Sequence, residues 1–316
     1  MKKILFITLI GFLISCKDAS ERKEIENQVN SKQYITVLGI AQDAGYPHIG
    51  CQKKCCTNFY NGNYKKQKVV ALGLVDTKNK QKWLFEATPD IATQLADLEQ
   101  NHLKTPHLID GIFLTHAHIG HYAGLMYFGR EALGKKGTKV FAMSKMKNFL
   151  SKNGPWSQLV NLQNIVFSDL KSDSAIVLNN RLKVTPFLVP HRDEFSETVG
   201  YKIEGPQKTA LFIPDINKWQ KWSKNIVDEV KKVDYAFLDA TFFKDGEINR
   251  PMSEIPHPFI EETLDLFKDE TWETKNKVIF IHFNHTNPAL QDRSKEKIES
   301  IKLGFRYAVE GMTLEL

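Results

Sequence analysis

The sequence predicts an α/β protein in which two mixed β-sheets pack face to face, with helices on their outer sides. Short apolar runs rich in β-branched and aromatic residues come first in pairs and then alternate with helical patterns. No glycine-rich phosphate loop follows the first of these runs, which argues against a nucleotide-binding doubly wound sheet. Roughly 280 residues of globular composition are enough for one large sandwich domain.

The expected elements follow from this patterning along the chain. Runs with strand composition cover residues 35–40, 69–75, 82–86, 111–114, 139–142, 164–167, 182–189, 199–204, 208–213, 235–239 and 277–281. Apolar residues at helical spacing cover 89–100, 122–133, 144–151, 216–233 and 258–268. Several chemically active side chains follow directly after the predicted strands, so one edge of the sandwich is the expected position of a site.

Residues 1–15 have the features of a secretory signal. Lys2 and Lys3 precede an apolar run that is shorter than the roughly 20 residues needed to cross a membrane. The ending at Ser15 and Cys16 resembles a bacterial lipobox, which implies a lipid on Cys16, attachment to a membrane and a location in the cell envelope. An ordinary signal peptide with an incidental cysteine is the alternative. The polar residues 16–33 are predicted to form a tether, and 34–316 a single domain.

The charge pattern restricts the partners. The net charge of +6 loses two lysines with the predicted signal, and the remaining basic residues are scattered along the chain. No basic stripe interleaved with aromatic residues is present in the sequence, so no nucleic-acid partner is predicted. The mildly basic balance suits a small anionic substrate, although such a charge also serves solubility.

The strongest local pattern is a group of three histidines directly after a predicted strand. His116, His118 and His121 fall within six positions, in a chain that has ten histidines in all. Alternate residues leaving a strand share a face, so His116 and His118 can bind one metal ion, and His121 can approach it from the next helix. Three exposed loop histidines would be the alternative, and this clustering argues against it.

This arrangement resembles the signature of the metallo-β-lactamase superfamily, which implies a four-layer αββα sandwich. By the same resemblance, His191 is the third ligand of a first ion, Asp215 bridges two ions and His282 belongs to the second site. Gly120 stands where most members have an aspartate that binds the second ion. The resemblance therefore implies one or two zinc ions, with iron or manganese as alternative metals.

A narrower resemblance covers nearly the whole globular part. The segments 37–39, 51–56, 189–192, 198–201, 238–243 and 281–288 are similar to pyrroloquinoline quinone biosynthesis protein B and its relatives, a branch that includes a cyclic phosphodiesterase of phosphonate catabolism. The phosphodiesterase comparison implies a separate structural zinc ion with a closed set of four ligands, namely Cys51, Cys55, Cys56 and His285. A disulfide with one free thiol, or buried inert cysteines, are the alternatives.

These features predict a metal-dependent hydrolase that acts on a phosphodiester or a related ester through metal-activated water. Asp215, Asp193 and His257 are the candidate catalytic side chains: Asp215 or Asp193 would orient the water, and His257 would protonate the leaving group. Asp239 is a candidate for orienting a ligand histidine, and residues 43–48 for a wall of the cleft. Two other classes stay open: an oxygenase with iron or copper, and an envelope lipoprotein that only binds.

Overall fold

A computed structural model describes residues 32–316 except 250, 252, 253 and 292. The predicted signal, the lipobox cysteine Cys16 and nearly all of the predicted tether lie outside the described residues. The first strand, β1, spans Gln33–Gly39 and so begins one residue before the predicted start of the domain. Within the described part of the chain, no helix combines the length and the apolar character needed to cross a membrane.

Two seven-stranded sheets form the centre of the domain. The first has the order β14-β1-β2-β3-β4-β5-β6 and the second β13-β12-β11-β10-β9-β8-β7. Each sheet joins an antiparallel half to a parallel half, so both are mixed, as predicted. The bounds of the remaining strands are β2 Ala71–Asp76, β3 Gln81–Phe85, β4 Gly111–Phe113, β5 Thr138–Ala142, β6 Ile165–Asp169, β7 Ile176–Val177, β8 Lys183–Leu188, β9 Val199–Glu204, β10 Thr209–Ile213, β11 Tyr235–Asp239, β12 Val278–Ile281, β13 Arg306–Tyr307 and β14 Thr313–Glu315.

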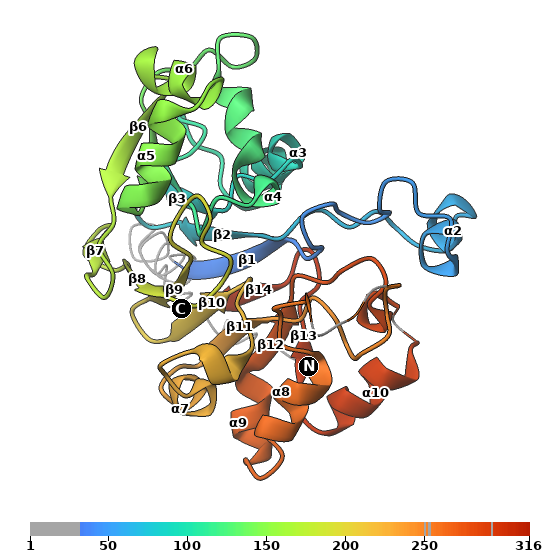
Figure 1. Ribbon diagram of the computed structural model, residues 1–316. Helices are drawn as coiled ribbons and strands as arrows, with labels where there is room; N and C mark the ends of the chain where they lie inside the picture. The colour runs from blue at the N-terminus through green and yellow to red at the C-terminus, as the bar shows by residue number, and fades with distance from the viewer. Residues whose placement is uncertain (1–31, 250, 252–253, 292) are drawn as a thin grey trace, which may run out of the picture. The chain divides into compact units, whose positions relative to one another are not determined.

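Helices cover the outer side of each sheet. Figure 1 shows one group beside the first sheet and a second group beside the second sheet, so the order of layers is helices, sheet, sheet, helices. The first group is α3 (Ile91–Asp97), α4 (Ile119–Tyr122), α5 (Ser144–Lys152) and α6 (Trp156–Asn161). The second is α7 (Ile226–Lys231), α8 (Ile260–Leu266), α9 (Trp272–Lys277) and α10 (Lys295–Lys302); α2 (Lys54–Tyr60) carries two of the cysteines.

Two predicted helices are wrong in extent. The pattern at 216–233 contains only a short 3₁₀ turn and α7, because Asn225 accepts hydrogen bonds from the backbone N–H groups of Val227 and Asp228 and so fixes a new helix start. The pattern at 122–133 contains a 3₁₀ turn that ends at Phe128, before the extended residue Gly129. In both segments buried apolar residues come from several short elements in succession, such as Leu125 and Phe128 in the 3₁₀ turn and Ile226 and Val230 in α7, so their spacing does not require one continuous helix.

Aromatic packing between the sheets fixes the strand that leads to the histidines. The rings of Phe85, Phe113 and Phe141 stack in sequence, with centroid distances of 4.9 and 4.1 Å. Tyr201, on β9 of the other sheet, packs its edge against Phe85 and Phe113. Its buried hydroxyl donates a hydrogen bond to the carbonyl oxygen of Leu114. The end of β4 is therefore held by both sheets just before the histidine motif begins.

Candidate metal centre

The histidine motif occupies the turn from β4 into α4. His116 and His118 lie in the connecting loop, and His121 lies within α4. The first and last of these rings are buried, and His118 keeps 16% of its side chain exposed. The loop thus directs three rings inward, while His118 remains open to an approaching molecule.

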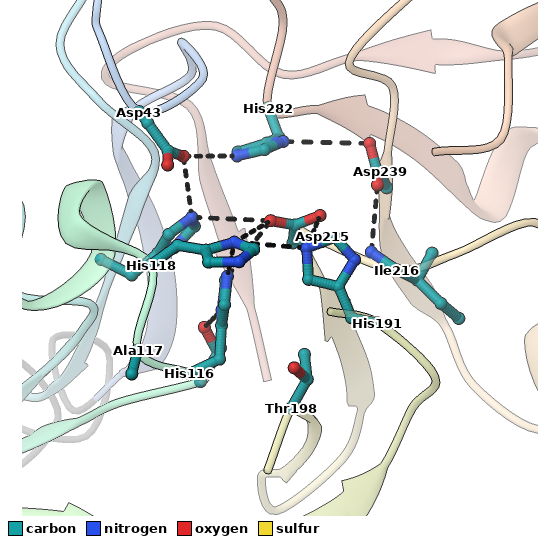
Figure 2. Close-up of polar contacts among 12 residues, drawn as sticks. Asp43, His116, Ala117, His118, His191, Thr198, Asp215, Ile216, Asp239 and His282 are labelled. Atoms are coloured by element: carbon teal, nitrogen blue, oxygen red, sulfur yellow. Dashed lines mark hydrogen bonds and ion pairs between the residues drawn. The ribbon is translucent and has the colours of Figure 1, made fainter. Parts of the chain in front are cut away.

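Four residues from three strand ends form the first cluster. His191 follows β8 and Asp215 follows β10, and both side chains turn toward His116 and His118 (Figure 2). The Nε2 atom of His116 lies 2.8 Å from Nδ1 of His118 and 3.3 Å from Oδ2 of Asp215. The Nε2 atom of His191 lies 3.3 Å from Nδ1 of His118 and 3.2 Å from Oδ1 of Asp215.

This donor set fits a divalent ion. Nitrogen and oxygen ligands of tetrahedral zinc stand about 3.3 Å apart, because each lies about 2.0–2.1 Å from the ion. The separations in the cluster lie close to that value. Oδ1 of Asp215 is buried and accepts no hydrogen bond of suitable geometry among the described residues, although Nε2 of His191 and Nδ1 of His257 lie 3.2 and 3.1 Å from it. A cation bound between these side chains would coordinate this oxygen directly.

A second cluster lies beside the first. It contains His121, His282 and Asp43, a loop residue that follows β1. Oδ1 of Asp43 lies 3.0 Å from Nε2 of His121 and 3.4 Å from Nε2 of His282, and Figure 2 shows Asp43 facing His282. Nε2 of His121 is in turn 3.8 Å from Oδ2 of Asp215. Asp215 therefore lies between the two clusters, in the position that the sequence resemblance predicts for a bridging carboxylate.

Sequence reasoning missed Asp43 as a possible ligand. It predicted only that residues 43–48 form a wall, because a single aspartate in a loop has no diagnostic spacing. The one available signal was Gly120, where the resemblance implies an aspartate and the chain supplies none. Conversely, Asp193 is exposed, accepts a hydrogen bond from the Thr198 hydroxyl, and lies outside the potential metal clusters found among the described residues. The structure gives Asp193 no contact that would support the predicted catalytic role.

The far nitrogens of His116, His282 and His121 each have a polar neighbour, whereas Nδ1 of His191 is buried without a hydrogen-bond partner among the described residues. Nδ1 of His116 contacts the Thr115 hydroxyl at 2.9 Å, and Nδ1 of His282 contacts the Thr241 hydroxyl at 2.9 Å. Nδ1 of His121 faces the buried carboxylate of Glu86 at 3.4 Å. Such partners fix a ring's orientation and leave its other nitrogen for the ion.

His257 is buried in the loop before α8. Its Nδ1 atom lies 2.9 Å from Oδ2 of Asp239 and 3.1 Å from Oδ1 of Asp215. Asp239 also accepts hydrogen bonds from the backbone N–H groups of Ile216 and Thr241. It therefore orients His257 and the residue that follows Asp215, a positioning role.

The electrostatics of the two clusters favour added positive charge. Burial opposes protonation of His257, but the carboxylates of Asp239 and Asp215 outweigh it and raise its pKa to about 10. Burial likewise opposes a charged His121, yet Asp43 and Glu86 hold its pKa well above the ordinary value. Burial holds the pKa of His116 well below its ordinary value, so this ring is neutral and keeps a lone pair for a metal.

The cysteines form a separate cluster with His285. The Sγ atoms of Cys51 and Cys55 are 3.7 Å apart, and those of Cys55 and Cys56 lie 3.6 and 3.5 Å from Nδ1 of His285. Ligands of a tetrahedral zinc ion are separated by about 3.8 Å for two sulfurs and about 3.6 Å for sulfur and nitrogen. The adjacent residues Cys55 and Cys56, at the start of α2, thus reach one centre together. The sulfurs are far from the bonding distance of about 2.05 Å that a disulfide requires.

A cavity of about 350 Å³ opens beside the first two clusters. His257 lines it, together with Arg192, His48, Asn284 and Glu254. Arg192 directly follows His191, so a positive side chain stands next to the candidate ligands. The cavity can accept a small polar molecule that carries negative charge.

The chain is similar in sequence to a family model and to curated proteins of similar length. A family model described as the beta-lactamase superfamily domain matches residues 81–283. Coenzyme PQQ synthesis protein B of Nitrosococcus oceani is 24% identical over 316 residues, covering 89% of this chain and 99% of that protein. The protein of the same name from Gluconobacter oxydans is 26% identical over 309 residues, covering 89% of this chain and 98% of its own length.

Solved structures show the same fold. Zinc-bound PqqB from Methylobacterium extorquens has a TM-score of 0.75 and 20% identity, covering 90% of this chain and all of that one. A diphosphatase of the PhnP family has a TM-score of 0.62 and 20% identity, covering 90% of this chain and 97% of that one. The predicted metallo-β-lactamase sandwich is therefore confirmed.

Proposed function

The chain belongs to the beta-lactamase superfamily, and on this premise we propose that it is a metal-dependent hydrolase that acts on a phosphodiester or a related ester. The observation that carries the proposal is the convergence of His116, His118, His191 and Asp215 from separate strand ends. A zinc-bound structure of PqqB among the structural neighbours supports a metal cofactor in this fold. Zinc is accordingly the metal proposed here.

His116, His118 and His191 would hold the first ion, and Asp215 would complete its shell. A zinc ion bound there lowers the pKa of a coordinated water toward ~7 and polarises the ester under attack. The first and third of these rings are buried and fixed, and His118 borders solvent, so a substrate approaches from the side of His118. Asp215 faces both clusters and is the proposed acceptor that orients the water.

His257 has the position and charge of a proton donor. Its Nδ1 atom is engaged by two carboxylates, so Nε2 remains for a substrate in the cavity that this residue lines. A pKa near 10 keeps the ring protonated at neutral pH. Protonating the departing oxygen is the step this residue would perform.

The cavity supports an anionic substrate of modest size. Arg192 supplies a fixed positive charge, and Asn284 and His48 supply hydrogen-bonding groups, against one acidic residue, Glu254. A guanidinium group binds phosphate oxygens well because its donors match their geometry. The diphosphatase among the structural neighbours makes phosphate ester chemistry the first class to test.

A structural zinc ion at Cys51, Cys55, Cys56 and His285 is the second metal assignment. His285 lies three residues beyond His282, so this ion would tie α2 to the segment that carries a candidate active-site ligand. Closed sets of three cysteines and one histidine are typical of structural zinc, and their binding free energy contributes to folding.

The names of the curated relatives suggest one rival activity. The curated relatives of similar length take part by name in coenzyme PQQ synthesis, so an oxygenase that uses iron in the same ligands is the second candidate. A non-catalytic binding protein is the third. Metal analysis of the purified protein bears on the first two, since zinc is the metal proposed for the hydrolase and iron or copper for the oxygenase.

The decisive assay is hydrolysis of bis-p-nitrophenyl phosphate by the zinc-loaded protein. We expect activity in the wild type and its loss in His118→Ala, because that change removes a ligand. His107→Ala serves as the matched control, since His107 is 44% exposed and pairs with Asp110 outside both clusters. Equal rates in wild type and His118→Ala would contradict the proposal, as would an active site that retains iron and not zinc.

A further inference from the structure

We infer that Asp43 supplies the carboxylate ligand of a second active-site ion, in place of the aspartate that is absent at position 120. This inference rests on the proposed metal-dependent function and makes it more specific, because it predicts a dinuclear site in a chain that lacks the usual residue. The ligands of the second ion would be Asp43, His121 and His282, with Asp215 shared between the two ions.

The donor atoms of these residues already converge. Oδ1 of Asp43 lies within hydrogen-bonding range of Nε2 of both histidines, at 3.0 and 3.4 Å. The opposite nitrogens of the two rings face Glu86 and Thr241, so both Nε2 atoms are left for the centre. A simple ion pair would need only one histidine; two rings that meet one carboxylate oxygen form a ligand set.

The space normally used by residue 120 is filled by Asp43. A Cβ atom built on Gly120 would lie 2.6 Å from both Cα and Cβ of Asp43 and 2.8 Å from its Cγ. Real Cβ contacts are essentially never this short, and one of the atoms is backbone, so no side chain fits at 120 while Asp43 holds its place. An aspartate at position 120 and Asp43 in its present position would therefore occupy the same space, so the chain can have only one of them.

The loop that carries Asp43 is fixed against the segment that carries His282. The N–H of Gln42 donates to the carbonyl oxygen of Phe283 at 2.8 Å, and the N–H of Phe283 donates to that of Ile40 at 2.8 Å. Asp43 and His282 are thus each one residue from this pair of hydrogen bonds. His282 itself has a φ of +69°, a strained value for a non-glycine residue. Strain held at such a position is frequent in functional sites.

Three carboxylates surround the ring of His121. Oδ1 of Asp43 lies 3.0 Å and Oδ2 of Asp215 lies 3.8 Å from its Nε2 atom, and Oε1 of Glu86 lies 3.4 Å from its Nδ1 atom. Asp43 and Asp215 thus approach the same ring nitrogen, where an ion bound by these residues would lie.

The test counts metal ions by mass spectrometry after zinc loading and dialysis of the full chain. The wild type should hold two active-site ions besides any ion at the cysteines. Asp43→Asn, which keeps the shape of the side chain, should hold one ion fewer or bind it on the order of 100-fold more weakly. Asp169→Asn, at an exposed carboxylate outside both clusters, is the matched control and should keep every ion.

Gly120→Ala tests the same geometry without removing a ligand. Its methyl group would displace the backbone at Asp43, so we expect the same loss of one ion, with circular dichroism showing that the fold is retained. A full ion count in both Asp43→Asn and Gly120→Ala would overturn the inference. A single active-site ion in the wild type that His118→Ala removes would also overturn it, yet leave the proposed function standing. No ion lost on His118→Ala would instead contradict the proposed function.

Discussion

The hydroxyl of Tyr201 on one sheet donates a hydrogen bond to the carbonyl oxygen of Leu114 on the other, two residues before His116. Both partners are buried, and Tyr201 also packs against the stacked rings of Phe85 and Phe113. Leu114 directly follows β4, and the carbonyl oxygen of the next residue, Thr115, accepts a hydrogen bond from the N–H of Val199 at 3.2 Å. The start of the histidine loop is thus held to the second sheet at two successive carbonyl groups. The packing of the two sheets therefore also positions the loop that carries the histidines of the candidate site.

Tyr201→Phe should therefore affect stability and metal binding together. Removing the hydroxyl leaves the Leu114 carbonyl oxygen buried without its donor, a loss of about 1–3 kcal/mol in the free energy of unfolding. Denaturant titration should show this loss, and zinc competition with a chelator should show weaker binding at the first site. Tyr60→Phe, at a 66% exposed tyrosine, is the control. Unchanged unfolding and unchanged zinc affinity would contradict the role given to this bond.

His257→Gln should impair hydrolysis in a way that depends on the leaving group. A p-nitrophenolate departs without a proton, whereas an alkoxide needs one, so the loss should be small for p-nitrophenyl esters. For alkyl phosphodiesters it should be on the order of 10²–10⁴-fold. Steady-state rates for the two substrate types, with equal metal content verified, provide the measurement. An equal loss for both would show that His257 does not donate the proton.

Zinc uptake at the cysteine cluster should release protons. Burial and the neighbouring thiols raise the pKa of Cys55 to about 12, and burial raises that of Cys56, so both thiols are protonated at neutral pH in the ion-free state. Burial and His48 lower the pKa of His285 to about 4, so its ring is already neutral. Binding should then expel about two protons from Cys55 and Cys56, in addition to any that Cys51 still carries, and zinc affinity should rise with pH.

Calorimetry in two buffers of different ionisation enthalpy measures this release directly. Cys56→Ser should lose the ion and the buffer dependence that belongs to it. Lys54→Ala, an exposed residue of the same helix, should retain both. A zinc binding enthalpy that is the same in both buffers would contradict the thiol protonation described here.

Cys16→Ser tests the predicted lipid anchor. The wild-type precursor, expressed in a bacterium, should sediment with membranes and incorporate an alkyne-tagged palmitate. The variant should incorporate none, because the acylated sulfur is gone, whereas Cys56→Ser should still be labelled. Labelling that persists in Cys16→Ser would place the lipid elsewhere, and a wild type without label would mean that the signal is an ordinary one.

The sequence alone was sufficient for the residues that share a local rule. His116, His118 and His121 stand at short spacing after an apolar strand, and such a pattern can be read without a structure. His191, Asp215 and His282 required a family resemblance, because a single polar residue after a strand is usually structural. The two mixed sheets could be predicted from the order of the patterns. Strands that come in pairs favour antiparallel neighbours, whereas strands that alternate with helices favour parallel neighbours.

Asp43 could not be found in this way. Its place depends on the hydrogen bonds between the end of β1 and the residue after His282, which are contacts across more than two hundred positions of sequence. The helix α2 was also missed, because its seven residues contain two of the candidate zinc ligands, Cys55 and Cys56, and no apolar stripe. Both features are set by tertiary contacts and by an expected ion, which leave little trace in periodicity.

The central claim is that an ion sits among His116, His118, His191 and Asp215. Anomalous diffraction from crystals of the zinc-loaded protein, recorded on both sides of the zinc edge, tests it most directly. We predict a peak about 2.0–2.2 Å from Nε2 of His116, Nδ1 of His118 and Nε2 of His191. Zinc-loaded crystals with a peak at the cysteines and none at these three nitrogens would contradict the account.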